Sequence, residues 1–189
     1  MRVPIRAPLL VLAMILAAGL APTGNPPSAS SPAGPPENFA RVDDRVFRSG
    51  QPDRKQLEFL VNNHDIKSLL TLRQNHDDES EARGLPLRLY RIPMRAGNIR
   101  RSQMIEALAV LRDAPKPILI HCWHGSDRTG FIVALYRMVF QSWARERVID
   151  EFKEVRFGHH EEVYPNLERA LRTVDVEKLK AEVLPKNAP

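Results

Sequence analysis

Short apolar runs alternate with longer helix-like segments through residues 45–184. Residues 116–122 are the clearest strand, because the run is continuously apolar and contains β-branched residues, as expected for a strand covered on both faces. Residues 65–73 indicate a second buried strand, residues 85–94 a third with partial alternation, and residues 45–52 a short extended piece that ends in a Gly-Gln-Pro turn. The pattern therefore predicts several short strands separated by helices.

Helices are predicted between and after these strands, where apolar residues recur three or four positions apart. Asp53 is the expected N-cap of a helix over residues 54–63, and Ser102 that of a helix over residues 102–114. Residues 130–143 are too long and too apolar for a strand, so they predict a buried central helix. Three further helices follow: residues 144–155, with Val148, Ile149, Phe152 and Val155 inward, residues 164–174 and residues 175–184.

Strands that alternate with helices indicate the fold class, an α/β domain with a largely parallel central sheet flanked by helices. The 189 residues, of which 43% are hydrophobic and 27% charged, fit one globular domain with extra length at one end. We place the folded domain at residues 39–184. Residues 22–38 are rich in Pro, Ser, Gly and Ala and cannot bury enough apolar surface to offset their ordering entropy, so we expect a flexible linker there.

The first 21 residues have the layout of an export signal. Arg2 and Arg6 precede an apolar run over residues 9–20, and small residues follow. The run is short for a membrane span, which needs about 20 apolar residues. We therefore expect an exported protein, periplasmic or extracellular. An uncleaved membrane tether is the alternative, because a proline directly follows the small-x-small site at residues 19–21.

Cys122 is the only cysteine in the chain, so it cannot close an intramolecular disulfide. Cys122 is either a small buried apolar residue or a reactive thiol, and the residues around it in the sequence are the evidence that distinguishes the two. Cys122 stands at the end of the strand predicted over residues 116–122, and the next helix is expected to begin near Arg128. The five residues between Cys122 and Arg128 therefore form a strand-to-helix loop.

A loop of this kind can bind an anion. Unpaired backbone N–H groups at a helix N-terminus and in the preceding loop point into one concavity, and the helix dipole adds partial positive charge. The same field favours thiolate over thiol, so we expect Cys122 to be a nucleophile at neutral pH. Arg128 can bind two oxygens of a phosphate. Thr129 can donate a hydrogen bond to the thiolate or to a leaving thiol.

Other residues of the loop fit the same function. Gly125 and Gly130 permit close approach of the backbone. His121 can orient the loop by hydrogen bonding, and His124 would add positive charge when protonated. Together with Ser126 these are the expected substrate-binding residues.

Residues 121–130, HCWHGSDRTG, resemble the signature of the cysteine-dependent protein tyrosine and dual-specificity phosphatases: His-Cys, five residues, Arg, then Ser or Thr. Six positions match it: His121, Cys122, Gly125, Arg128, Thr129 and Gly130. DRVFRSGQP, SLLTLR, IPM and the apolar segment after the signature are similar to the small bacterial exported members. The resemblance implies a phosphatase-like fold and hydrolysis of phosphate monoesters, on a phosphorylated protein or small phosphorylated substrate, through a phosphocysteine intermediate. It also implies that no cofactor and no metal is needed.

The general acid is missing from its usual place in that family, a separate loop that supplies an aspartate. The corresponding stretch, IPMRAGNIRRSQM, contains no Asp or Glu. Asp127 is one candidate, because some phosphoinositide phosphatases, such as the myotubularins, are similar in carrying an aspartate before the arginine. It could instead cap the following helix or hold Arg128 through a salt bridge. Asp77 or Asp78 could swing over the pocket, although a solvated charged loop is the simpler expectation for both.

Six arginines and no carboxylate lie between residues 83 and 104: Arg83, Arg88, Arg91, Arg95, Arg100 and Arg101. Near the pocket they would raise the local concentration of an acidic substrate. We recognise no nucleic-acid-binding module, so nucleic acid is not an expected partner. His159, His160, Glu161 and Glu162 are expected in an exposed loop rather than at a metal, because adjacent histidines cannot readily share one ion.

Other functions remain open from the sequence alone. A phosphate-binding pseudophosphatase with weak or no turnover would keep the anion loop, and the missing acid favours it. A phosphoinositide or inositol phosphate phosphatase is a second alternative. A sulfurtransferase or arsenate reductase also uses a cysteine in such a loop, but the match beyond Arg128 argues against it. We expect a monomer, close to a membrane if the tether is retained.

Overall fold

The computed structural model describes residues 34–184, so the predicted export signal and most of the predicted linker lie outside the described residues. Five short strands form one sheet in the order β1-β2-β5-β3-β4. The pair β1–β2 is antiparallel, and the pairs β2–β5, β5–β3 and β3–β4 are parallel. The strands are β1 (Ala40–Arg41), β2 (Val46–Ser49), β3 (Ser68–Thr71), β4 (Arg88–Arg91) and β5 (Ile118–His121). The predicted α/β class with a largely parallel sheet is thus confirmed.

The strand that precedes the cysteine lies in the middle of the sheet. Its last residue, His121, is paired with Ser49 of β2 on one side and with Thr71 of β3 on the other. Parallel strands that end in register place their following loops at the same edge of the sheet. The loops after β2, β3 and β5 therefore converge around Cys122.

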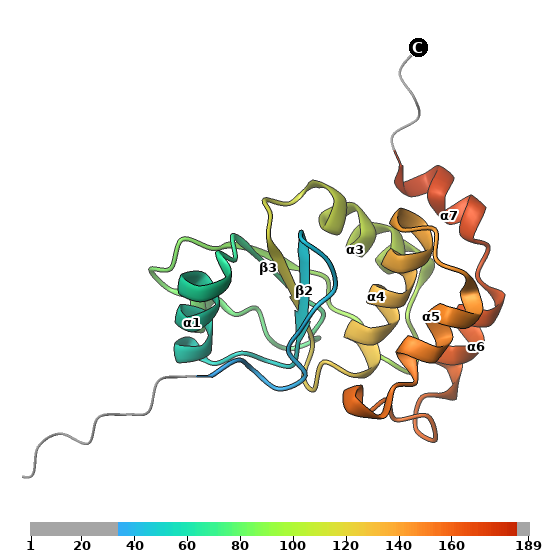
Figure 1. The fold of residues 1–189 in the computed structure, drawn as a ribbon, viewed down its shortest axis with the longest axis horizontal. Coiled ribbons are helices and arrows are strands. Elements are labelled where there is room, and N and C mark those ends of the chain that lie inside the picture. Colours follow the sequence, from blue (N-terminus) through green and yellow to red (C-terminus); the bar gives the residue numbers. More distant parts are fainter. Residues whose placement is uncertain (1–33, 185–189) are drawn as a thin grey trace, which may run out of the picture. The chain divides into compact units, whose positions relative to one another are not determined.

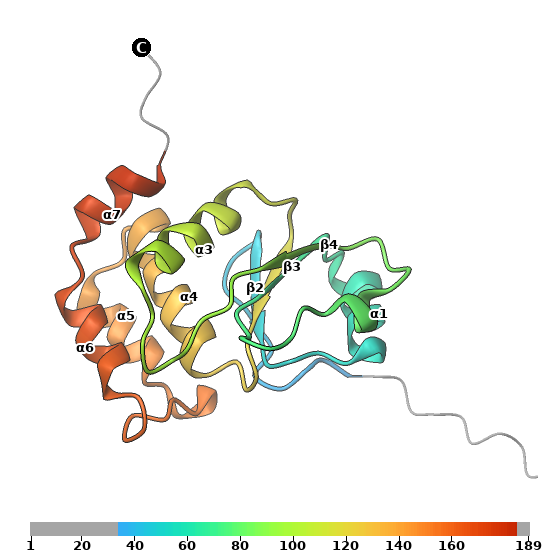
Figure 2. The same cartoon turned by 180° about the vertical axis from the view of Figure 1, so that it is seen from behind.

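Helices cover both faces of the sheet (Figures 1 and 2). On one face a small apolar cluster joins Leu57, Ala82 and Leu119 beneath α1 (Arg54–His64) and α2 (Glu79–Ala82). A larger core lies on the other face beneath the remaining helices: α3 (Arg101–Asp113), α4 (Asp127–Phe140), α5 (Arg145–Phe152), α6 (Pro165–Thr173) and α7 (Val176–Val183). Nearly every residue of α4 is buried, which confirms the predicted central helix. No helix within residues 34–184 is long and apolar enough to cross a bilayer.

The N-terminus of α1 is capped by the predicted residue, whereas that of α3 is not. Asp53 caps α1 as predicted: its carboxylate accepts from the Gln56 N–H at 2.8 Å, while Gln56 Oε1 accepts from the Asp53 N–H at 2.9 Å. Ser102 does not cap α3, because the helix begins earlier, at Arg101. Gln103 reaches back to the Arg100 N–H at 2.8 Å and satisfies this end of the helix instead.

The segment after α4 differs from the prediction at Val155. Val148, Ile149 and Phe152 of α5 face the core as predicted, but Val155 is 95% exposed. The α-helix ends at Phe152, and the chain then forms the 3-10 turn η1 (Val155–Phe157). This change of period turns Phe157, rather than Val155, into the interior.

Candidate active site

Residues 122–128 connect the end of β5 to the start of α4, as the sequence predicts. Cys122 is 2% exposed, and α4 begins at Asp127. Gly125 has φ +78°, and a Cβ at this position would lie 2.5 Å from the carbonyl carbon of Ser49. Only glycine fits this turn, because the loop is pressed against the end of β2. Gly130 packs against the ring of Phe152, where a Cβ would lie 3.1 Å from ring carbons.

The start of α4 carries polar atoms that have no partner in the described part of the chain. Arg128 Nε and Thr129 Oγ1 are both buried and unpaired there. The remaining contact of the Arg128 guanidinium is long, 3.4 Å from Nη1 to the Met94 carbonyl oxygen. Buried polar groups in folded proteins nearly always have partners. These two side chains are therefore suited to bind an anion at the loop.

Two adjoining recesses open beside Arg128 and share four lining residues: Gln74, Met94, Arg95 and Asn98. One, of about 400 Å³, includes Arg128 and Tyr164, and the other, of about 440 Å³, includes Arg100. Neither recess is lined by a carboxylate. Arg95 and Arg100 of the arginine-rich stretch thus border the pocket, whereas Arg101 pairs with Glu182 on the surface.

Arg48 is a site residue that the sequence analysis did not single out. It lies in β2, is 2% exposed, and donates from Nη2 to the Gly125 carbonyl oxygen at 2.7 Å. Its guanidinium lies 3.7 Å from the centre of the Phe157 ring. Burial lowers the pKa of Arg48 to about 10, so it remains cationic at neutral pH. An arginine within the buried strand VFRS was the signal that could have identified it, since arginine is almost never fully buried without a partner.

Asn38 and Gln51 hold the outer side of the loop. Asn38 Nδ2 donates to the His124 carbonyl oxygen at 2.7 Å and lies 3.4 Å from Ser126 Oγ. The Gln51 N–H donates to the Trp123 carbonyl oxygen at 2.8 Å. Composition predicts a linker that includes Asn38, but the contacts of Asn38 with His124 and Ser126 place it with the folded domain. Of the predicted substrate-binding residues, His124 is exposed and Ser126 is buried.

Asp127 binds a distant loop rather than Arg128. Its Oδ1 accepts from the His160 N–H at 3.0 Å and lies 2.8 Å from His159 Nδ1, while Oδ2 lies 2.8 Å from His160 Nδ1. Burial raises the pKa of Asp127, but the hydrogen bonds from His159 and His160 outweigh it and lower the pKa to about 2. The carboxylate is therefore ionised and fully engaged at neutral pH. That Asp127 is the general acid stays a prediction.

The expectation of an exposed loop at residues 159–162 is confirmed for His160, Glu161 and Glu162, but it is wrong for His159. The side chain of His159 is 3% exposed, and its ring lies 4.1 Å from that of Phe152. His160 is 44% exposed and lies beside His124 of the loop at residues 122–128, the phosphate loop, with ring centres 5.6 Å apart. His159 is buried against the carboxylate of Asp127, whereas His160 contacts the same carboxylate from an exposed position.

Asp127 should contribute to stability in a pH-dependent way. Its folded pKa of about 2 lies below the ordinary value of 3.8, which corresponds to about 2 kcal/mol of stabilisation above pH 4. We expect Asp127→Asn to lower the free energy of unfolding by about this amount at pH 6. The difference from wild type should shrink as the pH falls from 4 towards 2, because protonation removes the same contacts. Urea denaturation across this range measures it, with Asp150→Asn at an exposed position as control; a pH-independent difference would contradict this assignment.

Asp77 and Asp78 lie in different environments. Asp77 is exposed, and its carboxylate accepts from the Glu79 N–H at 3.1 Å. Asp78 is 1% exposed, so the expectation of a solvated loop is wrong for this residue. Its Oδ2 lies 2.8 Å from His121 Nε2, and its Oδ1 accepts from Gln51 Nε2 at 2.6 Å. Held from both sides, Asp78 is not placed to swing over the pocket.

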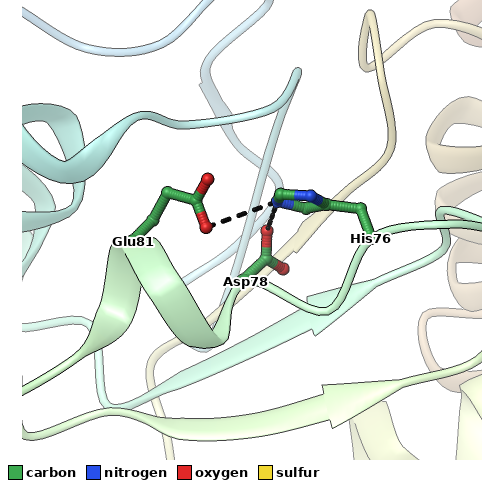
Figure 3. A group of neighbouring side chains, drawn as sticks. All are labelled: His76, Asp78 and Glu81. Carbon is green, nitrogen blue, oxygen red and sulfur yellow. Dashed lines mark ion pairs between the residues drawn. The ribbon is translucent and has the colours of Figure 1, made fainter.

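Asp78 also belongs to a group with His76 and Glu81, whose ligand-type atoms lie within 4.8 Å of one another (Figure 3). His76 Nε2 lies 3.0 Å from Asp78 Oδ1 and 3.5 Å from Glu81 Oε2. Because both oxygens of Asp78 already bind Gln51 and His121, we interpret the group as an ion-pair network that supports the loop. Burial raises the pKa of Asp78, but the hydrogen bond from His121 and further contacts outweigh it and hold the pKa below its ordinary value.

Several known proteins are similar in sequence to this chain over the residues that form the site and its sheet. A family model described as "Tyrosine phosphatase family" matches residues 34–184. The "Dual specificity protein phosphatase TpbA" of Pseudomonas aeruginosa is 27% identical over 173 residues, which cover 84% of this chain and 78% of the relative. The "Inositol diphosphatase SIW14" of Saccharomyces cerevisiae is 33% identical over 132 residues, which cover 65% of this chain and 47% of the relative.

Solved structures of the same two relatives are similar in fold. A crystal structure of P. aeruginosa TpbA in complex with pTyr has a TM-score of 0.72 and 25% identity, over 79% of this chain and 91% of that one. The core catalytic domain of S. cerevisiae SIW14 in complex with citrate has a TM-score of 0.68 and 26% identity, over 78% and 91%. Since the family model spans the sheet, the phosphate loop and all of the helices that position it, this chain belongs to the tyrosine phosphatase family, as a cysteine-dependent phosphatase of the tyrosine and dual-specificity type.

Proposed function

We propose that this phosphatase works through a phosphocysteine intermediate on Cys122. The Cys122 sulfur attacks phosphorus, the bond from phosphorus to the leaving oxygen breaks, and that oxygen takes up a proton. Water then attacks the phosphocysteine, which releases inorganic phosphate and the thiolate. The observation that carries the proposal is the buried thiol at the end of β5 beside the unpaired Arg128 Nε and Thr129 Oγ1.

The surrounding residues have separate roles in this scheme. Arg128 and the backbone N–H groups of the loop hold the equatorial oxygens, where charge develops in the transition state. Thr129 Oγ1 donates to the sulfur when it leaves. Arg48, from β2, donates to the Gly125 carbonyl oxygen and so keeps the N–H groups of the loop turned towards the anion. The mechanism predicts turnover without added metal and inhibition by vanadate.

We propose phosphorylated proteins, with phosphotyrosine as the preferred group, as the first substrate class. The chain is similar over most of its length to a phosphatase whose structure was solved with pTyr bound. The recess beside Arg128 is lined by Met94 and Tyr164, apolar and aromatic surface suited to an aryl group.

Inositol phosphates are a second candidate, favoured by a separate observation. Arg95 and Arg100 line the adjoining recess, and no carboxylate does. Such a site concentrates positive charge where further phosphates of a small, highly anionic substrate would lie. Several relatives that are 30 to 36% identical over 128 to 132 residues carry the name inositol diphosphatase.

A substrate panel distinguishes these classes. Phosphate release is measured from a phosphotyrosine peptide, a phosphoserine peptide, inositol phosphates, an inositol diphosphate and phosphoinositide vesicles, with the wild type and Arg95→Ala. A protein phosphatase should have its highest kcat/KM on the phosphotyrosine peptide and tolerate Arg95→Ala. An inositol phosphatase should prefer the inositol substrates and lose about tenfold or more in Arg95→Ala, since one charge-assisted contact is worth about 1.5–3 kcal/mol. Arg88→Ala, at an exposed position outside both recesses, is the matched control.

The leaving-group dependence of Asp127→Asn tests whether Asp127 is the acid. A nitrophenolate leaves without a proton, whereas general acid help to a poor leaving group is worth about 10²–10⁴-fold. Because the Asp127 carboxylate is ionised and bound by His159 and His160, we expect Asp127→Asn to slow nitrophenyl and alkyl phosphates alike, by about tenfold. Parallel kcat/KM measurements on both substrates decide the matter. A selective loss on the alkyl phosphate would instead identify Asp127, and not Asp77, as the general acid.

We further propose that the protein is exported and monomeric. The support is the charged and apolar pattern of residues 1–21, with membrane proximity expected if that segment is retained. Fractionation of the source cells followed by N-terminal sequencing should find a mature N-terminus near residues 20–24 outside the cytoplasm. Full-length protein in the membrane fraction would support the tether, and full-length protein in the cytosol would contradict export.

A further inference from the structure

Asp78 lies where three loops of the active-site edge meet. Its carboxylate contacts His121 at the end of β5, Gln51 after β2 and His76 after β3. Figure 3 shows that the carboxylates of Asp78, at the end of the loop after β3, and of Glu81, on α2, both face the His76 ring. One buried carboxylate thus joins the three segments that surround the catalytic cysteine.

The contact with His121 leads directly to the nucleophile. His121 is fully buried, with Nε2 2.8 Å from Asp78 Oδ2 and Nδ1 3.3 Å from the carbonyl oxygen of Cys122. The Asp78 carboxylate and the Cys122 carbonyl oxygen can only accept hydrogen bonds, so both contacts are hydrogen bonds when Nε2 and Nδ1 each carry a proton. Asp78 therefore fixes the orientation of the imidazole and, through it, the backbone at Cys122.

The contact with Gln51 reaches the next residue of the phosphate loop. The backbone N–H of Gln51 donates to the Trp123 carbonyl oxygen at 2.8 Å, and its side-chain oxygen accepts from Arg73 Nη1 at 3.0 Å. The Arg73 guanidinium in turn lies 4.1 Å from the centre of the Trp123 ring. Both sides of the Asp78 carboxylate thus support neighbouring positions, Cys122 and Trp123.

The backbone of Asp78 is itself unusual. Its φ is +65°, in the left-handed region that non-glycine residues rarely adopt outside constrained sites. The hydrogen bonds of the side chain offset the cost of this backbone conformation. They also satisfy the buried carboxylate, which would be far more unfavourable without partners. Asp78 is thus held in one position by its backbone and by both of its oxygens.

We propose that Asp78 is a positioning residue for catalysis, which acts through His121 to hold Cys122 in the geometry that favours the thiolate and its attack. The inference rests on the phosphocysteine mechanism proposed above. Other charges also lie at the site. Arg48 binds the Gly125 carbonyl oxygen, Arg73 lies over the Trp123 ring and Arg128 stands at the start of α4, while His76 and Glu81 face Asp78. A test must therefore separate positioning from the plain effect of charge.

Asp78→Asn keeps the shape of the side chain but replaces one acceptor oxygen with a donor, which must then face a donor of His121 or Gln51. We expect kcat on an aryl phosphate to fall about 10- to 100-fold with little change in KM, because small misplacements of reacting groups have effects of this size. The rate of Cys122 alkylation by iodoacetamide should fall at pH 6, and the midpoint of its pH profile should move to higher pH. Loss of a nearby negative charge alone would move that midpoint to lower pH.

Two comparisons complete the experiment on the purified full chain. Glu79→Gln, an exposed carboxylate one residue away, should leave kcat and the alkylation profile unchanged. The double variant of Asp78→Asn with His121→Asn should be no slower than the worse single variant, because both changes break one path. Asp78→Ser, which cannot overpack the site, replaces Asp78→Asn if that variant fails to fold.

The outcomes separate this inference from the mechanism on which it rests. An unchanged kcat, a midpoint that moves to lower pH, or losses that multiply in the double variant would each overturn the role of Asp78. A fall in melting temperature with an unaltered alkylation profile and kcat would show that Asp78 only stabilises the fold. Turnover that survives removal of the Cys122 thiol would instead overturn the phosphocysteine mechanism itself.

Discussion

Cys122→Ser should abolish turnover, with kcat lowered by at least about 10⁴-fold. Removal of the nucleophile in enzymes that use covalent catalysis has effects of this size or larger. A serine hydroxyl at this position has nearly the same shape but is not ionised at neutral pH, so it cannot attack phosphorus at a useful rate. Steady-state phosphate release from an aryl phosphate measures the loss, in the absence of added metal.

Binding should survive the same substitution. Cys122 is buried, while the groups expected to hold phosphate oxygens, Arg128, Thr129 and the loop N–H groups, are unchanged in the variant. Calorimetric titration with a phosphotyrosine peptide should therefore still detect a complex, and the melting temperature should stay close to that of the wild type. Turnover within about tenfold of wild type would exclude a phosphocysteine intermediate.

The phosphate loop could be predicted from the sequence because its parts are neighbours in the chain. Residues 116–130 contain a buried strand, a lone cysteine, two glycines and an arginine. The strand, the loop and the helix start that form the site are therefore continuous in the sequence. The four parallel strands were predictable for the same reason, since each is a short local pattern, but the antiparallel edge strand β1 was not predicted. Helix caps were less certain: Asp53 was correct, but Gln103 replaced Ser102 at the start of α3.

The partners of the residues that support the loop could not be predicted, because they are remote in the sequence. Arg48 binds Gly125 over 77 positions, Asp78 binds His121 over 43, and Asp127 binds His160 over 33. Spacing says nothing about such pairs. The register of β2, β3 and β5 brings together the first two, and the contact of the loop after η1 with the start of α4 brings together the third. Each is a charged residue that the fold buries, which is costly without a partner. The composition of the loops at residues 74–82 and 158–164 gave no sign of that burial.

Arg128→Lys should lower kcat/KM on an aryl phosphate by about 10²- to 10³-fold, the range seen when one donor to a developing oxyanion is removed. A lysine keeps the charge but offers a single ammonium group in place of a planar fork that can bind two oxygens at once. The unpaired Nε of Arg128 lies at the start of α4, where such a fork would face the anion held by the loop. Kinetics of the wild type and Arg128→Lys on the same substrate measure the effect.

Arg48→Lys is the informative comparison, because Arg48 binds a carbonyl oxygen of the loop and is not one of the groups expected to hold the anion. It holds the Gly125 carbonyl oxygen and stacks on Phe157, so its replacement should lower the melting temperature as well as kcat. Arg128→Lys should lower the melting temperature little and should also weaken inhibition by inorganic phosphate, since it acts on the anion and not on the fold. If Arg128→Lys kept its kcat/KM within threefold while Arg48→Lys lost activity, the anion would be held by the backbone of the loop alone, and Arg128 would have no direct part in catalysis.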